Sequence, residues 1–229
     1  FADAEAAFSK SLAIKEKLAQ TFPSVPEYRY QLPGTHNNLG TVLESQERRD
    51  EAQAAYEKAV LIQERLAAEA PTVTAYVVAL AGTYTNLGRL LGDRGRLEPS
   101  LPWLTKSVDL LESTLRQDPR VVKVRESLCI ASWARAMTLS GLNRHAEAQK
   151  DWDRALEMDN GRYRNELRMK SASNLLNLQD HVREAAAAEL IAGSANATAE
   201  ESYNAACLLA LSAGLTSGDQ SLAEAYAAR

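Results

Sequence analysis

The sequence predicts an all-α fold, a right-handed α-solenoid of antiparallel helix pairs, and three observations support this prediction. The segment THNNLG at 35–40 recurs as TYTNLG at 83–88, which is 48 positions further along the chain. Pro23, Pro71 and Pro119 follow one another at the same spacing. Between the prolines, apolar residues recur three and four positions apart, as they do on one face of a helix. Self-similarity at such a period indicates units that each stack on their neighbours.

We expect a single array over 1–229, in which prolines and helix-end signals set the repeat boundaries. Pro71 and Pro119 should stop helices, because a proline inside a helix removes a hydrogen bond and clashes with the preceding turn. Asp159-Asn160-Gly161 should end another helix by helix-end chemistry and not by proline. The chain begins within a helix pair and without an initiator Met, so we expect a fragment of a longer protein. The predicted units are about 1–22 (partial), 27–70, 75–118, 121–159, 162–192 and 199–229 (partial).

Small residues predict how the helices of a pair approach one another. Nine of eighteen aligned positions are identical between 23–40 and 71–88. Gly40 is expected to face Ala52 and Ala59, so that two antiparallel helices can lie close together.

Two places depart from this pattern. The third copy has Ala134-Arg135-Ala136 in place of Asn-Leu-Gly, and its first helix is expected to be rotated or irregular. Pro99 and Pro102 are expected within the first turn of a helix, where backbone donors are unpaired in any case.

Composition limits the class of partner. The chain has 45% hydrophobic and 24% charged residues, which suits a folded protein with a continuous core. A net charge of −4 gives no reason to expect nucleic acid or an acidic membrane surface. No apolar run approaches the roughly 18 to 20 residues that span a bilayer. Cys129 and Cys207 both lie in apolar helical runs, and we expect buried free thiols in the cytoplasm.

The repeat pattern resembles a known family. Read from His36, it places Leu39-Gly40 three and four positions later, and then Ala52, Tyr56 and Ala59. This pattern resembles the tetratricopeptide repeat. The phrases SLAIKEKLAQTFPSVPEYRYQL and NNLG are similar to the long-helix repeats of kinesin light chains. They look more similar still to arrays that follow the kinase domain in planctomycete bacterial serine/threonine kinases, a comparison that YNAACLLALSAG at 203–214 strengthens.

The resemblance implies a scaffold for protein–protein interaction that binds a peptide or partner protein in a concave groove lined by first helices. An Asn amide suits such a groove, because it can both donate to and accept from a peptide backbone. The alternative is that these amides, Asn38 and Asn86 above all, bond within the array. Lys170 and Asn174 also have the spacing of a carboxylate clamp, but the cations that would complete it are missing. On the family's register the groove positions are Asn37, Thr41, Thr85, Asn86, Arg89, Lys170, Asn174 and, more loosely, Asn204.

No pattern indicates an enzyme, a cofactor or a metal site. His36, His145 and His181 fall in different units, without Cys, Asp or Glu at ligand spacing. His36 occupies a packing position, whereas His145 and His181 lie at helix starts and are expected in solvent. A second hypothesis is self-association, in which two copies of a multidomain kinase stack or swap a helix at an open end of the array to form a homodimer. Mutation of Phe1 or Phe8 is expected to disrupt such a dimer.

Overall fold

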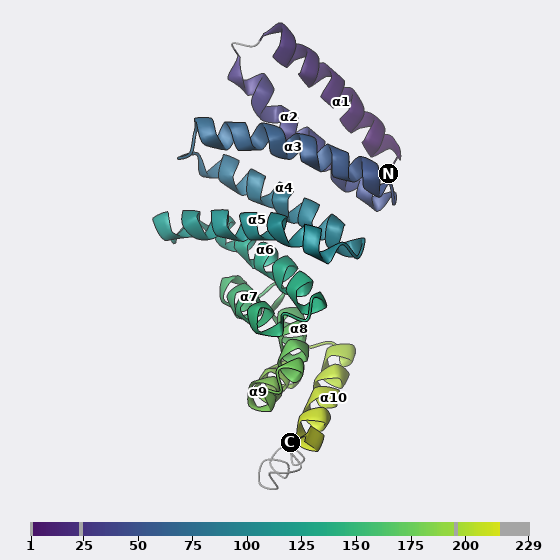
Figure 1. Ribbon diagram of the computed structural model, residues 1–229, viewed down its shortest axis with the longest axis vertical. Helices are drawn as coiled ribbons and strands as arrows, with labels where there is room; N and C mark the ends of the chain where they lie inside the picture. The colour runs from purple at the N-terminus through teal and green to yellow at the C-terminus, as the bar shows by residue number, and fades with distance from the viewer. Residues whose placement is uncertain (1, 23–24, 195–196, 216–229) are drawn as a thin grey trace. The chain divides into compact units, whose positions relative to one another are not determined.

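The computed structural model describes residues 2–22, 25–194 and 197–215, and these residues form helices joined by short turns (Figure 1). No strand occurs in these ranges. The prediction of an all-α solenoid of antiparallel helix pairs is confirmed. The predicted second helix of the last unit, near 218–229, lies outside the described residues. The helices are α1 Ala2–Thr21, α2 Pro26–Ser45, α3 Arg49–Glu69, α4 Thr74–Asp93, α5 Leu97–Gln117, α6 Val122–Gly141, α7 His145–Met158, α8 Arg164–Asn177, α9 His181–Ala192 and α10 Ala199–Leu215.

The chain divides into two compact units, Phe1–Ala134 and Arg135–Arg229. In the first unit, α1 to α5 pack in chain order, each helix against the next (Figure 1). In the second unit, α7 to α10 pack in the same way, and α10 also contacts α8. Packing between neighbours in sequence is what a solenoid requires. That all 229 residues form one continuous array stays a prediction.

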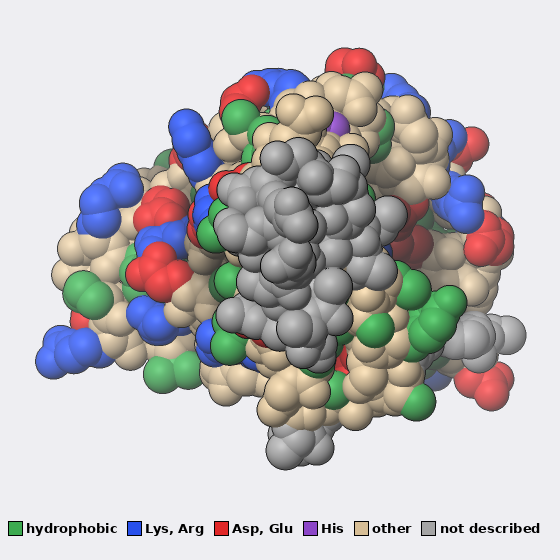
Figure 2. Space-filling view, turned by 90° about the horizontal axis from the view of Figure 1, so that it is seen from below, with side chains coloured by type: hydrophobic (Ala, Val, Ile, Leu, Met, Phe, Trp, Pro, Cys, Tyr) green, Lys and Arg blue, Asp and Glu red, His purple; other side chains and the backbone are tan. Residues whose placement is uncertain are grey.

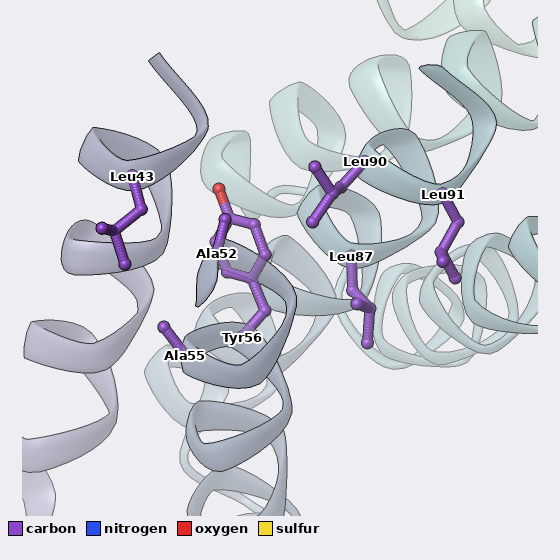
Figure 3. Close-up of a cluster of buried hydrophobic side chains, with 7 residues drawn as sticks. All are labelled: Leu43, Ala52, Ala55, Tyr56, Leu87, Leu90 and Leu91. Atoms are coloured by element: carbon purple, nitrogen blue, oxygen red, sulfur yellow. The ribbon is translucent and has the colours of Figure 1, made fainter. Parts of the chain in front are cut away.

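The core of the first unit joins one repeat to the next. Leu43 comes from α2, Tyr56 comes from α3, and Leu87 comes from α4, so one cluster holds three consecutive helices together (Figure 3). Each helix pair therefore buries its apolar face against the following pair. The buried members of the cluster are Leu43, Ala52, Ala55, Tyr56, Leu87, Leu90 and Leu91.

Glycine permits the close approach of the two helices in a pair, although the neighbour differs from the one we expected. A Cβ atom added at Gly40 would lie 2.6 Å from the Tyr56 ring, and one added at Gly88 would lie 2.6 Å from Cγ of Leu104. Ala52 and Ala59 are fully buried, as predicted. The close contact at Gly40 is nevertheless made by Tyr56, the large residue that lies between Ala52 and Ala59 in sequence. Its side chain reaches across to the first helix and leaves no room for a Cβ atom there.

The third copy replaces an apolar contact by an ion pair. Its first helix, α6, is a continuous α-helix, so the expectation of an irregular helix is wrong. Nε of Arg135 lies 2.7 Å from Oδ2 of Asp151, and its Nη2 lies 2.7 Å from Oδ1. The side chains of Arg135 and Asp151 are only 19% and 7% exposed. These two residues occupy the register of Leu87 and Trp103 in the second copy, where Leu87 belongs to a core cluster and Trp103 packs against that cluster.

Three further expectations have clear outcomes. α7 ends at Met158, and the carboxylate of Asp159 accepts hydrogen bonds from the backbone N–H groups of Gly161 and Tyr163, so the predicted stop is confirmed. Pro99 lies in the first turn of α5, but Pro102 lies in the second turn, contrary to expectation. Cys129 is buried as expected, whereas Cys207 is exposed, contrary to expectation.

Replacing Gly88 by Ala should lower the free energy of unfolding by about 1–3 kcal/mol, because the new methyl group overlaps Leu104. Gly82, in the same helix, is the matched control, since no heavy atom lies within 4 Å of its Cβ position. Gly82→Ala should raise stability by about 0.5–1 kcal/mol through helix propensity alone. Urea unfolding followed by circular dichroism measures both values. Equal effects at the two sites would contradict the close approach at Gly88.

Replacing Arg135 by Leu should destabilise the chain by about 3–5 kcal/mol, because it leaves the buried carboxylate of Asp151 unpaired. The double variant Arg135→Leu/Asp151→Ala restores the apolar pair Leu39 and Ala55 of the first copy. It should recover most of that loss, because apolar replacement of both partners is often neutral. A double-mutant cycle in urea gives the coupling energy, and additive losses would refute the pairing.

Candidate partner-binding groove

Helices α2, α4 and α6, the first helices of three successive repeats, border a hollow in the first unit. Its volume is about 290 Å³. Asn37, Thr85 and Asn86, three residues that the sequence placed in a groove, line it together. The second helix α3 contributes one residue to the wall. We call this hollow the amide pocket, and its lining is Gly34, Asn37, Gln63, Val78, Ala79, Gly82, Thr83, Thr85, Asn86, Ser127 and Ile130.

Two side-chain amides form a hydrogen-bonded pair across neighbouring repeats. Oδ1 of Asn37 accepts hydrogen bonds from Nδ2 of Asn86, at 3.0 Å, and from the hydroxyl of Thr83, at 3.2 Å. Within the described ranges, Nδ2 of Asn37 and Oδ1 of Asn86 have no protein partner. The NH₂ group of Asn37 and the carbonyl oxygen of Asn86 therefore remain available at the pocket, and together they complement the acceptor and the donor of a peptide group.

Gln63 is a pocket residue that the sequence did not reveal. It is 4% exposed, it lines the pocket, and its Oε1 has no hydrogen-bond partner among the described residues. It lies on a second helix, where no groove position was expected. The residue at its register in the next copy is the fully buried Leu111. A polar residue at an apolar register position is the signal that could have found it.

The other predicted positions of the first unit do not line the pocket. Thr41 is exposed, and its hydroxyl lies 3.2 Å from that of Tyr56. Arg89 is also exposed, and its Nη2 lies 4.0 Å from a carboxylate oxygen of Glu44. Although Thr85 lines the pocket, it is buried, and its hydroxyl bonds to the carbonyl of Ala81.

In the second unit, Asn174 bonds within the array. It is 3% exposed, and its Nδ2 donates to the carbonyl of His145 and to Oε1 of Gln149, both at 3.0 Å. Its Oδ1 lies 2.9 Å from Nδ1 of His145, which is half-buried instead of standing in solvent as expected. Lys170 is exposed and Asn204 is half-buried. The buried position of Asn174 favours the alternative in which its amide forms hydrogen bonds within the array and not with a partner. Asn174 does not line the amide pocket of the first unit.

Burial of His36 on α2 favours the neutral form of its imidazole. His36 is 4% exposed, as a packing residue should be, and burial lowers the pKa of its imidazole. Glu16, whose Oε1 lies 3.8 Å from Nε2, opposes this shift, and Lys58 adds to it.

Among the described residues, no three His, Cys, Asp or Glu side chains gather where they could hold a metal ion. Figure 2 shows both basic and acidic side chains among the described residues of the visible face.

The comparisons with known proteins agree with this architecture. The sequence profile of the tetratricopeptide repeat family matches residues 35–68 and 80–120. The chain contains tetratricopeptide repeats. The matched segments cover most of α2 to α5, so these repeats supply three of the four helices that line the amide pocket. A search of curated proteins finds no match.

One solved structure is similar in fold, and a second aligns more weakly. The crystal structure of BtubC (BKLC) from P. vanneervenii is similar with a TM-score of 0.66 and 16% identity, over 98% of this chain and 87% of that chain. The thermophilic tetratricopeptide repeat protein TTC0263 of Thermus thermophilus aligns with a TM-score of 0.42 and 18% identity, over 88% and 90% of the two chains. In the described part of the chain, no helix has the length and apolarity needed to cross a membrane.

Replacing His36 by Tyr, the residue at this register in the second repeat, should weaken the pH dependence of stability. The folded pKa of His36 lies below the unfolded value of 6.5, so the unfolded chain binds more protons in acid. The contribution of His36 to the free energy of unfolding is therefore fully present above about pH 6.5. It is lost as the pH falls from there towards the folded pKa. Urea midpoints between about pH 7.5 and 5, compared for the two proteins, test this. An unchanged slope would show that His36 does not titrate differently on folding.

Proposed function

We propose that this chain is a protein–protein interaction scaffold that binds an extended segment of a partner along α2, α4 and α6. Tetratricopeptide repeats generally mediate protein–protein interaction, and the amide pocket is the observation that carries the proposal. The free donor of Asn37 and the free acceptor of Asn86 suit a peptide backbone. Thr41 and Arg89, on the same two helices, extend the proposed surface beyond the pocket.

Preorganisation is the mechanism that we propose for binding. The groove residues lie on helices whose packing is fixed by the core of Leu43, Tyr56 and Leu87. A rigid wall needs little ordering when a ligand arrives, so more of the contact energy appears as affinity. No chemical step is part of this function, and we propose a scaffold and not an enzyme.

The resemblance to arrays that follow kinase domains supports a setting within a larger regulatory protein. In that setting the array would recruit a substrate or a partner. Among the described residues, neither Cys129 nor Cys207 forms a disulfide, which fits a reducing compartment such as the cytoplasm.

Self-association is the second candidate, and the surface of α1 favours it. Ile14, on α1, and Phe22, directly after α1, are 51% and 48% exposed, and α1 packs against α2. A second copy could cover these side chains in a homodimer. Of the two residues that the sequence suggested for this contact, Phe1 lies outside the described residues and Phe8 is half-buried. Light scattering over a range of concentrations distinguishes this candidate, because a dimer through α1 should dissociate when Ile14 is replaced by Glu.

The groove proposal is tested by filling the pocket. Gly82→Leu places a side chain in the pocket without meeting any heavy atom at its Cβ. It should reduce binding of peptides selected from a random displayed library by more than about tenfold, which is about 1.4 kcal/mol. Ala54→Leu adds a similar bulk at an exposed position of α3 outside the pocket, on the opposite side of that helix from Gln63, and it should leave affinity unchanged. Fluorescence anisotropy measures affinity, and circular dichroism checks the fold.

Failure to select any peptide would reject the proposal, and so would equal binding by the two variants.

A further inference from the structure

Two glycines of the amide pocket have no packing reason to be glycine. Gly34 and Gly82 lie inside helices, 48 positions apart in the same register. A glycine there costs about 1 kcal/mol relative to alanine. Gly40 and Gly88 compensate for this cost by letting a second helix approach, but no heavy atom lies within 4 Å of the Cβ position of Gly34 or Gly82. Both leave helix backbone bare at the pocket, as close approach of a ligand requires.

The buried amide of Gln63 also lacks a reason within the fold. Its unpaired Oε1 loses solvation without gaining a hydrogen bond, which destabilises a folded chain. The terminal torsion of Gln has a broad, roughly two-fold preference, so either end of the amide can face the pocket. A ligand group that both donates and accepts could satisfy Gln63 in either orientation.

The pocket contains no charge to balance a charged ligand. None of its eleven lining residues is ionisable. A carboxylate placed there would offer acceptors only, and it would be removed from water without a cation nearby. Ile130, which is 41% exposed, gives the wall an apolar patch for methylene groups. A volume of about 290 Å³ is at the small end of ligand sites, so it suits one side chain with its main chain and not a large cofactor.

We propose that the amide pocket binds the neutral carboxamide side chain of a Gln or Asn in the partner segment and discriminates against Glu and Asp. This inference rests on the proposed groove and adds its specificity. The ligand carbonyl accepts from Nδ2 of Asn37, and its NH₂ donates to Oδ1 of Asn86. Gln63 supplies the third partner. A hydroxyl group offers a single donor, so it satisfies the set less completely than a carboxamide does.

The experiment uses the peptides selected from the random library, made synthetically with the carboxamide residue changed. Gln→Glu in the peptide should weaken binding more than about tenfold, whereas Gln→Met should weaken it about threefold to tenfold, since the shape is kept and the hydrogen bonds are lost. Gln63→Met in the protein should reduce the preference for the Gln peptide over the Met peptide. The exposed Gln117 lies outside the pocket, and Gln117→Met is the control that should leave the preference unchanged.

The outcomes separate the two proposals. If Gly82→Leu abolishes binding but Glu peptides bind as well as Gln peptides, the groove stands and the carboxamide inference is overturned. Selection of peptides without any Gln or Asn, or an unchanged preference in the Gln63→Met protein, also overturns it. If no peptide binds, or if Gly82→Leu has no effect, the groove and the inference fail together.

Discussion

The close approach of two helices at a glycine is the constraint on which the first unit depends. At Gly40 and Gly88 the second helix of the pair inserts a large side chain, Tyr56 or Leu104, against bare helix backbone. This insertion sets the distance within each pair. Once that distance is set, the remaining apolar face of the pair can be covered only by the next pair. The first helices α2, α4 and α6 then border the amide pocket.

The fold could be predicted from the sequence because its information is periodic. Recurrence at 48 positions fixes which residues are equivalent, and proline and glycine signals fix where helices end. Periodicity places a residue on a helix face, but it does not say how far a side chain reaches. For that reason Gly40 could be placed near Ala52 and Ala59, whereas its contact with Tyr56 could not. The exchange of an apolar pair for Arg135 and Asp151 appears only when two residues 16 positions apart are compared together.

The candidate site could be predicted less completely, since the use of an amide depends on its neighbours. The repeat register determines which helix face a residue occupies, and it correctly placed three residues at the pocket: Asn37, Thr85 and Asn86. Asn174 was assigned by the same logic, yet His145 and Gln149 meet its amide inside the second unit. The partners of a side-chain amide lie on other helices, and the spacing along one helix contains no information about them.

The repeats themselves show that the pocket is not the best solution for packing. At the register of Gln63, the next repeat places the fully buried Leu111. At the register of Gly34 and Gly82, the following repeat places Ile130. The repeat architecture therefore tolerates an apolar side chain at the register of Gln63 and at the register of Gly34 and Gly82. The first two repeats have a polar residue or a glycine there instead. Three departures from the stable choice converge on one cavity. Natural proteins give up stability in this way where a site must stay open for a ligand, and the convergence is difficult to explain by packing alone.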